Sequence, residues 1–310
     1  MSVLDKRKIT NYGLGMTLLG TSVLQNLYQE FLDTELTYSK EVAVGLGVLP
    51  ADSGLKWAGE LHPCVVHSCS FRAAKVLVRL TASQGKLMAS GPKLTTLTMT
   101  FLQPKTGKKE LYQFNGTLQV HQQYGAGEAE LSVLVVVAFS HRPPEGFLQA
   151  HGSYLNLKKE ANQRREDRIA LTAENRALLE LANLNTLVTV EHIERKCLLR
   201  ELSYNGARVI LTGVAPFLLE KPFILDLPFV GRPVLKIPGN IVRAEPIEGH
   251  RGLAVIALGY HPDRVPVDYL RVLQKGFKLG LGAKKPVAQS KASGPQTSSI
   301  DLRTLKIKHP

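Results

Sequence analysis

Apolar and polar residues alternate in short runs along most of the chain, a pattern typical of strands that bury one face. In the first 150 residues we expect strands at 36–48, 64–71, 74–80, 94–101, 109–121 and 131–141. Clusters of Gly, Pro, Asp and Ser separate the runs, including a predicted turn at 51–54. Short strands at this spacing indicate a small antiparallel barrel or sandwich.

The segment before these strands has helical periodicity. Leu24, Leu27 and Phe31 recur on one face, which predicts an amphipathic helix over residues 15–33 that packs on the first domain. The basic residues 6–8 and the apolar run after them also have the outline of a signal peptide. No small-residue cleavage site follows, which favours the helix.

A second β-rich unit follows a break in the pattern. Residues 147–157 have helical spacing, and 158–167 are densely charged, which predicts a linker. We then expect strands at 187–192, 196–203, 207–211, 222–227, 236–244 and 253–260, with helical segments at 173–184 and 266–277. The fold class is therefore mainly β: two small antiparallel β-barrels with a few flanking helices. The predicted divisions are 1–150 (helix and first barrel), 151–168 (hinge), 169–277 (second barrel) and 278–310 (basic tail).

The net charge of +13 indicates an anionic partner. Nearly half of the excess positive charge lies in residues 278–310, which contain seven basic residues and a single acidic residue, Asp301. Rich in Lys, Ser, Gly and Pro, this tail is predicted to be disordered. It either keeps the protein soluble or serves as an electrostatic handle for nucleic acid or acidic lipid.

Several classes of protein are disfavoured by what the sequence lacks. It has no apolar run near the roughly 18 residues that span a bilayer, and its three Cys favour a reducing, cytoplasmic location. The cluster from His62 to Cys69 resembles a zinc site, but its ligands lie in one expected strand, where the odd spacing of Cys64 and Cys69 sends them to opposite faces. We find no catalytic or phosphate-loop motif, and therefore expect neither an enzyme nor a metal or cofactor.

Two motifs carry the functional information. Arg164, Arg165 and Arg168 form an Arg-x-x-x-Arg segment in the linker, and about 33 residues later Glu201, Ser203 and Gly206 form an acidic-x-Ser-x-x-Gly turn. Arginines can bind phosphate through two hydrogen bonds and stack on bases. A carboxylate and a hydroxyl can accept from the edge of a guanine, and glycine permits close approach or a positive φ. The pair suits a small ligand that combines guanines with phosphates.

This combination resembles the signature of the PilZ domain, a bacterial receptor for cyclic di-GMP. The resemblance covers about residues 160–277 and extends to 237–243 and 252–255, which are similar to later strands of that family. It implies that Arg164 and Arg168 clamp guanine and phosphate while Arg165 assists electrostatically. It further implies that the carboxylate and hydroxyl of the turn read the guanine edge, and that ligand binding rearranges the two domains.

The chain departs from the family at Glu201, where the family has Asp or Asn; the extra methylene bears on affinity. Residues 1–150 are similar to the N-terminal, PilZ-like domain of two-domain spirochaete receptors, through residues 63–64, 71–78 and 142–144. This half lacks both motifs, and the family implies that such a domain does not bind the nucleotide alone.

Simpler readings of the same residues remain open. Glu201 can pair with a neighbouring Arg, the Ser and Gly of the turn can serve the turn alone, and the arginines can be a solvated linker. The competing function is an adaptor with a degenerate PilZ domain, which binds nucleic acid or a protein partner through its basic linker and tail. PilZ receptors act in motility and related bacterial behaviour, and the sequence does not choose the output or the downstream protein partner.

Overall fold

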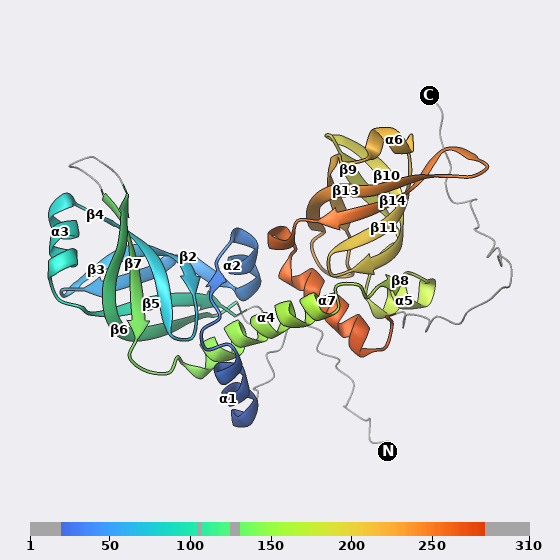
Figure 1. Cartoon of the computed structure of the whole chain (residues 1–310). Helices are drawn as coiled ribbons and strands as arrows, with labels where there is room; N and C mark the ends of the chain where they lie inside the picture. The colour runs from blue at the N-terminus through green and yellow to red at the C-terminus, as the bar shows by residue number, and fades with distance from the viewer. Residues whose placement is uncertain (1–19, 104–106, 125–130, 283–310) are drawn as a thin grey trace, which may run out of the picture.

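The protein consists of two antiparallel β-barrels linked by a long helix, α4 (Figure 1). The computed structural model describes residues 20–103, 107–124 and 131–282. Residues 15–19 of the expected first helix and residues 283–310 of the basic tail lie outside the described residues. The mainly β fold of two small barrels expected from the sequence is confirmed.

The first barrel is a closed ring of six strands in the order β3-β2-β5-β6-β7-β4, with β3 paired to β4 and the short β1 added to β3. Its strands are β1 (Leu36–Thr37), β2 (Val48–Trp57), β3 (Glu60–Cys69), β4 (Ala73–Leu80), β5 (Leu94–Leu102), β6 (Lys109–Tyr124) and β7 (Leu131–Phe139). Alternate residues of each strand fill the interior, as in Val76 and Val78 of β4 and Val133, Val135 and Val137 of β7, all fully buried.

The second barrel repeats this closure, in the order β11-β14-β13-β12-β9-β10, with β10 paired to β11 and β8 added to β10. Its strands are β8 (Ile169–Ala170), β9 (Asn185–Val190), β10 (Ile193–Ser203), β11 (Gly206–Thr212), β12 (Pro222–Leu227), β13 (Leu235–Ile247) and β14 (His250–Tyr260). Most of them begin and end within a few residues of the predicted runs, because alternation and turn residues mark strands locally.

Helices flank both barrels and fill the space between them. They are α1 (Thr21–Glu30), α2 (Lys40–Leu46), α3 (Ala82–Ser90), α4 (Glu145–Gln163), α5 (Ala173–Leu178), α6 (Ala215–Leu218) and α7 (Val267–Lys278), with a 3₁₀ turn at Pro262–Arg264. No helix among the described residues is both long and apolar enough to cross a membrane.

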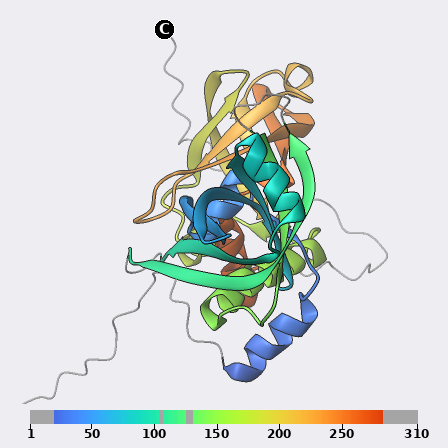
Figure 2. The ribbon, with the colours of Figure 1, turned by 90° about the vertical axis from the view of Figure 1, so that its left-hand side faces the viewer.

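Helix α4 belongs to both halves of the molecule. At its N-terminal end Phe147 is fully buried among aromatic rings of the first barrel, with its centroid 4.9 Å from that of Phe114 and 5.9 Å from that of Phe101. One turn later His151 stacks on Phe147, and burial lowers the pKa of its imidazole to about 3, so the ring stays neutral. The other end of α4 lies beside α7 of the second half, where Gln274 donates to Glu160 (Figure 1). In Figure 2 the first barrel faces the viewer and the second barrel lies behind it.

Three local predictions were wrong. Residues 40–46 form helix α2 instead of strand, because Ser39 caps its start and Gly47, at φ +75°, ends it. Residues 51–54 are part of β2, where a register shift absorbs the expected turn. Residues 158–163 are the last turns of α4 and not linker. The domain divisions drawn from the sequence stay a prediction.

The cysteine cluster is also arranged differently from the expectation. A register shift between Val66 and Ser68 of β3 breaks the alternation, so Cys64 and Cys69 are both buried in the first barrel, 5% and 0% exposed. Both thiols are free, and burial raises the pKa of Cys64 to about 12. Among the described residues, no group of His, Cys, Asp and Glu is placed to hold a metal ion.

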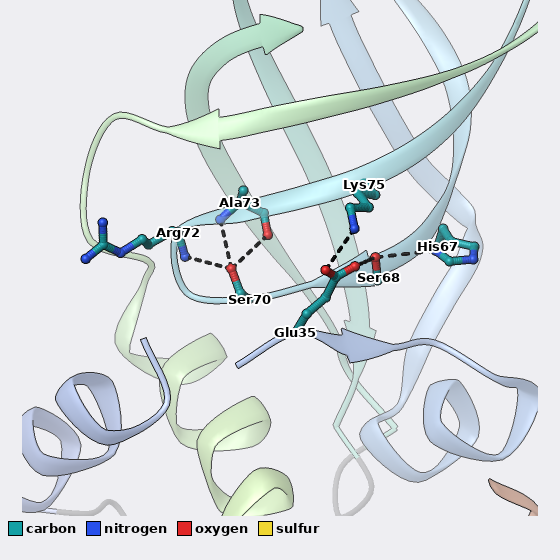
Figure 3. Close-up of polar contacts among 7 residues, drawn as sticks. All are labelled: Glu35, His67, Ser68, Ser70, Arg72, Ala73 and Lys75. Carbon is teal, nitrogen blue, oxygen red and sulfur yellow. Dashed lines mark hydrogen bonds and ion pairs between the residues drawn. The ribbon is translucent and has the colours of Figure 1, made fainter. Parts of the chain in front are cut away.

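A polar cluster fastens the segment after α1 to the first barrel (Figure 3). Glu35 accepts a hydrogen bond from the buried Ser68 of β3, and its other carboxylate oxygen lies 2.8 Å from the Lys75 ammonium of β4. The hydrogen bonds from Lys75 and Ser68 lower the pKa of the Glu35 carboxyl. His67 completes the cluster, with Nδ1 3.3 Å from the Ser68 hydroxyl.

The two halves meet through α7. Val267, its first residue, packs so closely on Gly45 of α2 that a β-carbon there would lie 2.1 Å from a methyl group of the valine. The Arg271 guanidinium lies 3.4 Å from the Gly45 carbonyl oxygen, and Gln274 donates to Glu160 of α4 at 2.7 Å. Helix α7 is therefore in contact with the first-barrel side and with the helix that leads to the arginine segment.

Candidate functional site

The predicted Ser-x-x-Gly turn is a tight hairpin between β10 and β11. Ser203 pairs with Gly206, and residues 204–205 form the turn. The Ser203 side chain is fully buried, with its Oγ 2.9 Å from the Asn205 Oδ1 and 3.1 Å from the Gly206 carbonyl oxygen. Its own carbonyl accepts a 2.7 Å hydrogen bond from the Tyr269 hydroxyl of α7. The serine therefore shapes the turn and ties it to α7.

Gly206 is required by close packing and not by its φ angle, which is not positive. A β-carbon at this position would lie 2.2 Å from the Leu258 carbonyl oxygen of β14. In the sheet Gly206 lies beside Gly259, and Gly259 beside Asn240 of β13. These small residues leave a low floor on the outer surface of the barrel.

The next row of the sheet carries charge. Glu201 of β10 is opposite Arg208 of β11, Arg208 is opposite Ala257, and Ala257 is opposite Arg243 of β13. The Glu201 carboxylate lies 3.5 Å from the Arg208 guanidinium. The alternative that Glu201 pairs with a neighbouring Arg is thus what the structure shows. Cross-strand pairing gathers these groups although they are up to 42 residues apart in sequence.

The arginine segment is held against this row by β8. Directly after Arg168, Ile169 and Ala170 pair with residues 202 and 201 of β10. The segment is a short turn in which the Asp167 amide donates to the Arg164 carbonyl oxygen at 3.0 Å. Residues 164–168 therefore connect the end of α4 to β8, the short strand that pairs with the Glu201 segment of β10.

A cavity of about 1030 Å³ lies between the arginine segment and the outer face of the barrel. Its walls come from the end of α4, the hairpin turn, strands β11, β13 and β14, and the loop before α7. Its charged lining residues are Lys158, Arg165, Arg168, Glu201, Arg208 and Arg243. Five cations against one carboxylate make the cavity strongly positive, and its size is at the upper end of small-molecule sites.

Two of the three predicted arginines line the cavity. Among the described residues, neither Arg165 nor Arg168 forms an ion pair, so both guanidinium groups are available to an anion. Arg164 is not part of the lining: its guanidinium lies 5.5 Å from the ring centroid of Phe277 and 3.7 Å from the Asp167 carboxylate. Arg164 thus lies outside the cavity, on the α7 side of the linker.

The structure brings four predicted residues together at the cavity, Arg165, Arg168, Glu201 and Gly206, and leaves Arg164 and Ser203 out of its lining. The sequence reasoning missed Arg208, Asn240 and Arg243, which line the same cavity. Arg208 is two residues after the glycine of the motif and so on the same face of its strand, a signal that alternation could have supplied. Asn240 and Arg243 lie in the 237–243 run that resembles a PilZ strand, but the sequence did not show that they reach the cavity, because their position there depends on pairing with β14.

Comparison with known proteins finds a family model and a relative that match this chain. Residues 22–158 match the model of the PilZN3 domain. The chain is similar to a "Cyclic di-GMP binding protein" of Treponema denticola, 28% identical over 306 residues that cover 95% of this chain and 97% of the relative.

Two solved structures are also similar. They are the PlzA protein of Borreliella burgdorferi in complex with c-di-GMP (18% identity, TM-score 0.39, 84% of this chain and 100% of that chain) and YcgR of Escherichia coli in complex with c-di-GMP (10% identity, TM-score 0.26, 84% and 88%).

Proposed function

We propose that this chain, whose residues 22–158 match the model of the PilZN3 domain, is a receptor that binds cyclic di-GMP in the cavity of its second barrel. The observation that carries the proposal is the meeting of both motifs there: Arg165 and Arg168 face the row that holds Glu201, across the floor formed by Gly206. The Treponema denticola relative, named for cyclic di-GMP binding and matched almost end to end, supports this ligand. The proposed role is recognition without an enzymatic step.

Each residue has a proposed role that follows from its position. Arg165 and Arg168 bind phosphate oxygens and stack on guanine, because their guanidinium groups line the cavity without an ion pair among the described residues. The Arg164 guanidinium becomes a third contact to the ligand when it moves away from the Phe277 ring. The Glu201 carboxylate leaves its ion pair with Arg208 and accepts hydrogen bonds from the guanine edge instead.

The remaining residues build or extend the site. Ser203 acts indirectly, by fixing the turn. Gly206 keeps the floor low. Arg208 and Arg243 add positive charge on the side of the cavity away from the linker, where the second half of the dinucleotide lies in this proposal.

The proposal extends to the consequence of binding. The cavity is lined by Pro262, Val265 and Leu270, so a ligand there lies directly against the start of α7, which packs on α2 of the first-barrel side. Binding is therefore proposed to alter the arrangement of the two barrels. Motility or a related bacterial behaviour is the proposed output, and the protein partner that reads the change is not specified by these contacts.

The test is calorimetric titration of the full chain with cyclic di-GMP, in wild type and in an Arg165→Ala, Arg168→Ala double variant. Loss of a charged hydrogen bond costs about 1.5–3 kcal/mol, so removal of both arginines is expected to lower affinity by at least roughly a hundredfold. The matched control is Arg72→Ala, Arg79→Ala, two arginines of the first barrel, which should bind like wild type. Equal affinity in both double variants would overturn the site.

A further inference from the structure

Arg164 is held outside the cavity by a specific aromatic contact. Its guanidinium lies 5.5 Å above the ring of Phe277, a residue of α7 that is 7% exposed, and it also faces Asp167 at 3.7 Å. Phe277 is in turn packed against Tyr204 of the hairpin turn, with ring centroids 5.2 Å apart. The three side chains form a stack of guanidinium, phenyl and phenol that links the arginine segment, α7 and the turn.

The phenol at the base of this stack is unusual. Tyr204 is 4% exposed, and its hydroxyl is buried without a hydrogen-bond partner among the described residues. Burial raises the pKa of the phenol, and the charges of Glu160, Arg164 and Asp167 also act on it, which locates the hydroxyl near the end of α4. A protonated hydroxyl buried without a partner destabilises the arrangement that encloses it.

We propose that Phe277 and Tyr204 set the affinity of the cavity for its anionic ligand, by holding Arg164 in a position that competes with ligand contact. The inference rests on the proposed function, because the ligand is the one named there. The Phe277 ring stabilises the outer position of Arg164 through a cation–π contact. In this proposal the Tyr204 hydroxyl, which lacks a hydrogen-bond partner among the described residues although Tyr204 lines the cavity, destabilises the same position, and it gains water or ligand as a partner when Arg164 moves away.

The competition predicts opposite effects for two substitutions in the same stack. The ligand binds the arrangement in which Arg164 reaches the cavity. Its apparent affinity is therefore lower the more the protein populates the outer position of Arg164. Phe277→Leu removes the ring that holds Arg164, so affinity for cyclic di-GMP should rise roughly two- to fivefold. Tyr204→Phe removes only the hydroxyl and favours the outer position, so affinity should fall roughly fivefold, while the melting temperature rises by about 2–4 °C.

The experiment is calorimetric titration of the full-length wild type and both variants with cyclic di-GMP, together with thermal unfolding of each. Phe229→Leu is the matched control, since Phe229 is 3% exposed, follows β12 in the second half of the chain and does not line the cavity. A rise for Phe277→Leu and a fall for Tyr204→Phe, with Phe229→Leu like wild type, support the inference.

Two results overturn the proposal in different ways. Binding by wild type with unchanged or uniformly reduced affinity in both stack variants overturns the competition alone, because loss of packing lowers affinity and cannot raise it. Absence of binding by wild type overturns the proposed function, and the competition falls with it.

Discussion

Gly206 gives the sharpest mutational test of how the site is built. The position has an ordinary φ, so Ala is excluded by space and not by backbone strain. A β-carbon there would lie 2.2 Å from the Leu258 carbonyl oxygen, whereas carbon and carbonyl oxygen normally approach to about 3.3–3.6 Å. The oxygen belongs to the β11–β14 ladder, so relief requires the two strands to separate by about 1 Å.

The cost can be estimated from the kind of atom that has to move. Overpacking a core costs about 1–3 kcal/mol, and we expect Gly206→Ala near the upper end, about 3 kcal/mol, since backbone has to move. For a barrel of this size that corresponds to a fall of roughly 10–20 °C in its melting temperature. Gly213→Ala is the control, because its β-carbon would meet chiefly the flexible end of the Leu218 side chain, at 2.7 Å.

The assay is thermal unfolding of the full chain, followed by circular dichroism and by tryptophan fluorescence. The sequence has one Trp, Trp57, which is buried in the first barrel and donates to the Pro92 carbonyl oxygen at 2.7 Å. Circular dichroism should show a destabilised transition in Gly206→Ala, while the Trp57 signal stays near wild type. If Gly206→Ala and Gly213→Ala unfold within about 0.5 kcal/mol of each other, the packing argument is refuted.

Three further outcomes are expected. Burial raises the pKa of Cys64 and Cys197 to about 12, so a thiol reagent at pH 8 should label the native protein slowly and the denatured protein at all three cysteines; rapid native labelling would contradict the burial. The pKa of Glu35 is lower in the folded protein, mainly through Lys75, so the carboxylate stabilises the protein above the unfolded value near 4.5 and loses that effect as the pH falls through the folded pKa. In Glu35→Gln the free energy of unfolding should therefore fall less steeply as the pH is lowered. The difference from wild type should stay below about 1 kcal/mol, since the side chain is 44% exposed, and an identical pH dependence in both proteins would contradict the prediction. Ser203→Ala should destabilise the second barrel by about 1 kcal/mol in denaturant titration. Unaltered stability would contradict the structural role of the hydroxyl and favour direct contact with the ligand.

The sequence predicted the barrels well because strand alternation is a local property. It predicted the end of α4 poorly, since residues 158–163 are all charged or polar except Ala161 and become helical through contacts with distant elements. Lys159 pairs with Glu30 of α1, and Glu160 accepts from Gln274 of α7. The buried Ala161 is the one apolar residue that marks the continuing helical face.

The candidate site was predictable only where its residues are close in sequence. The arginine segment and the Ser-x-x-Gly turn stood out as motifs, whereas Arg243 reaches the cavity through the pairing of β13 with β14. The sequence also did not predict which residues of the two motifs line the cavity. The Ser203 carbonyl accepts from Tyr269 of α7, and the stack under Arg164 contains Phe277 of the same helix, which begins more than 60 residues after the turn.

The central claim is that this cavity recognises cyclic di-GMP, and direct titration tests it most plainly. The full chain is titrated by calorimetry with cyclic di-GMP, and separately with GTP and cyclic di-AMP, at one fixed salt concentration. The account predicts saturable binding of cyclic di-GMP that neither control nucleotide reproduces. Absence of heat with cyclic di-GMP, or equal binding of all three nucleotides, would contradict it.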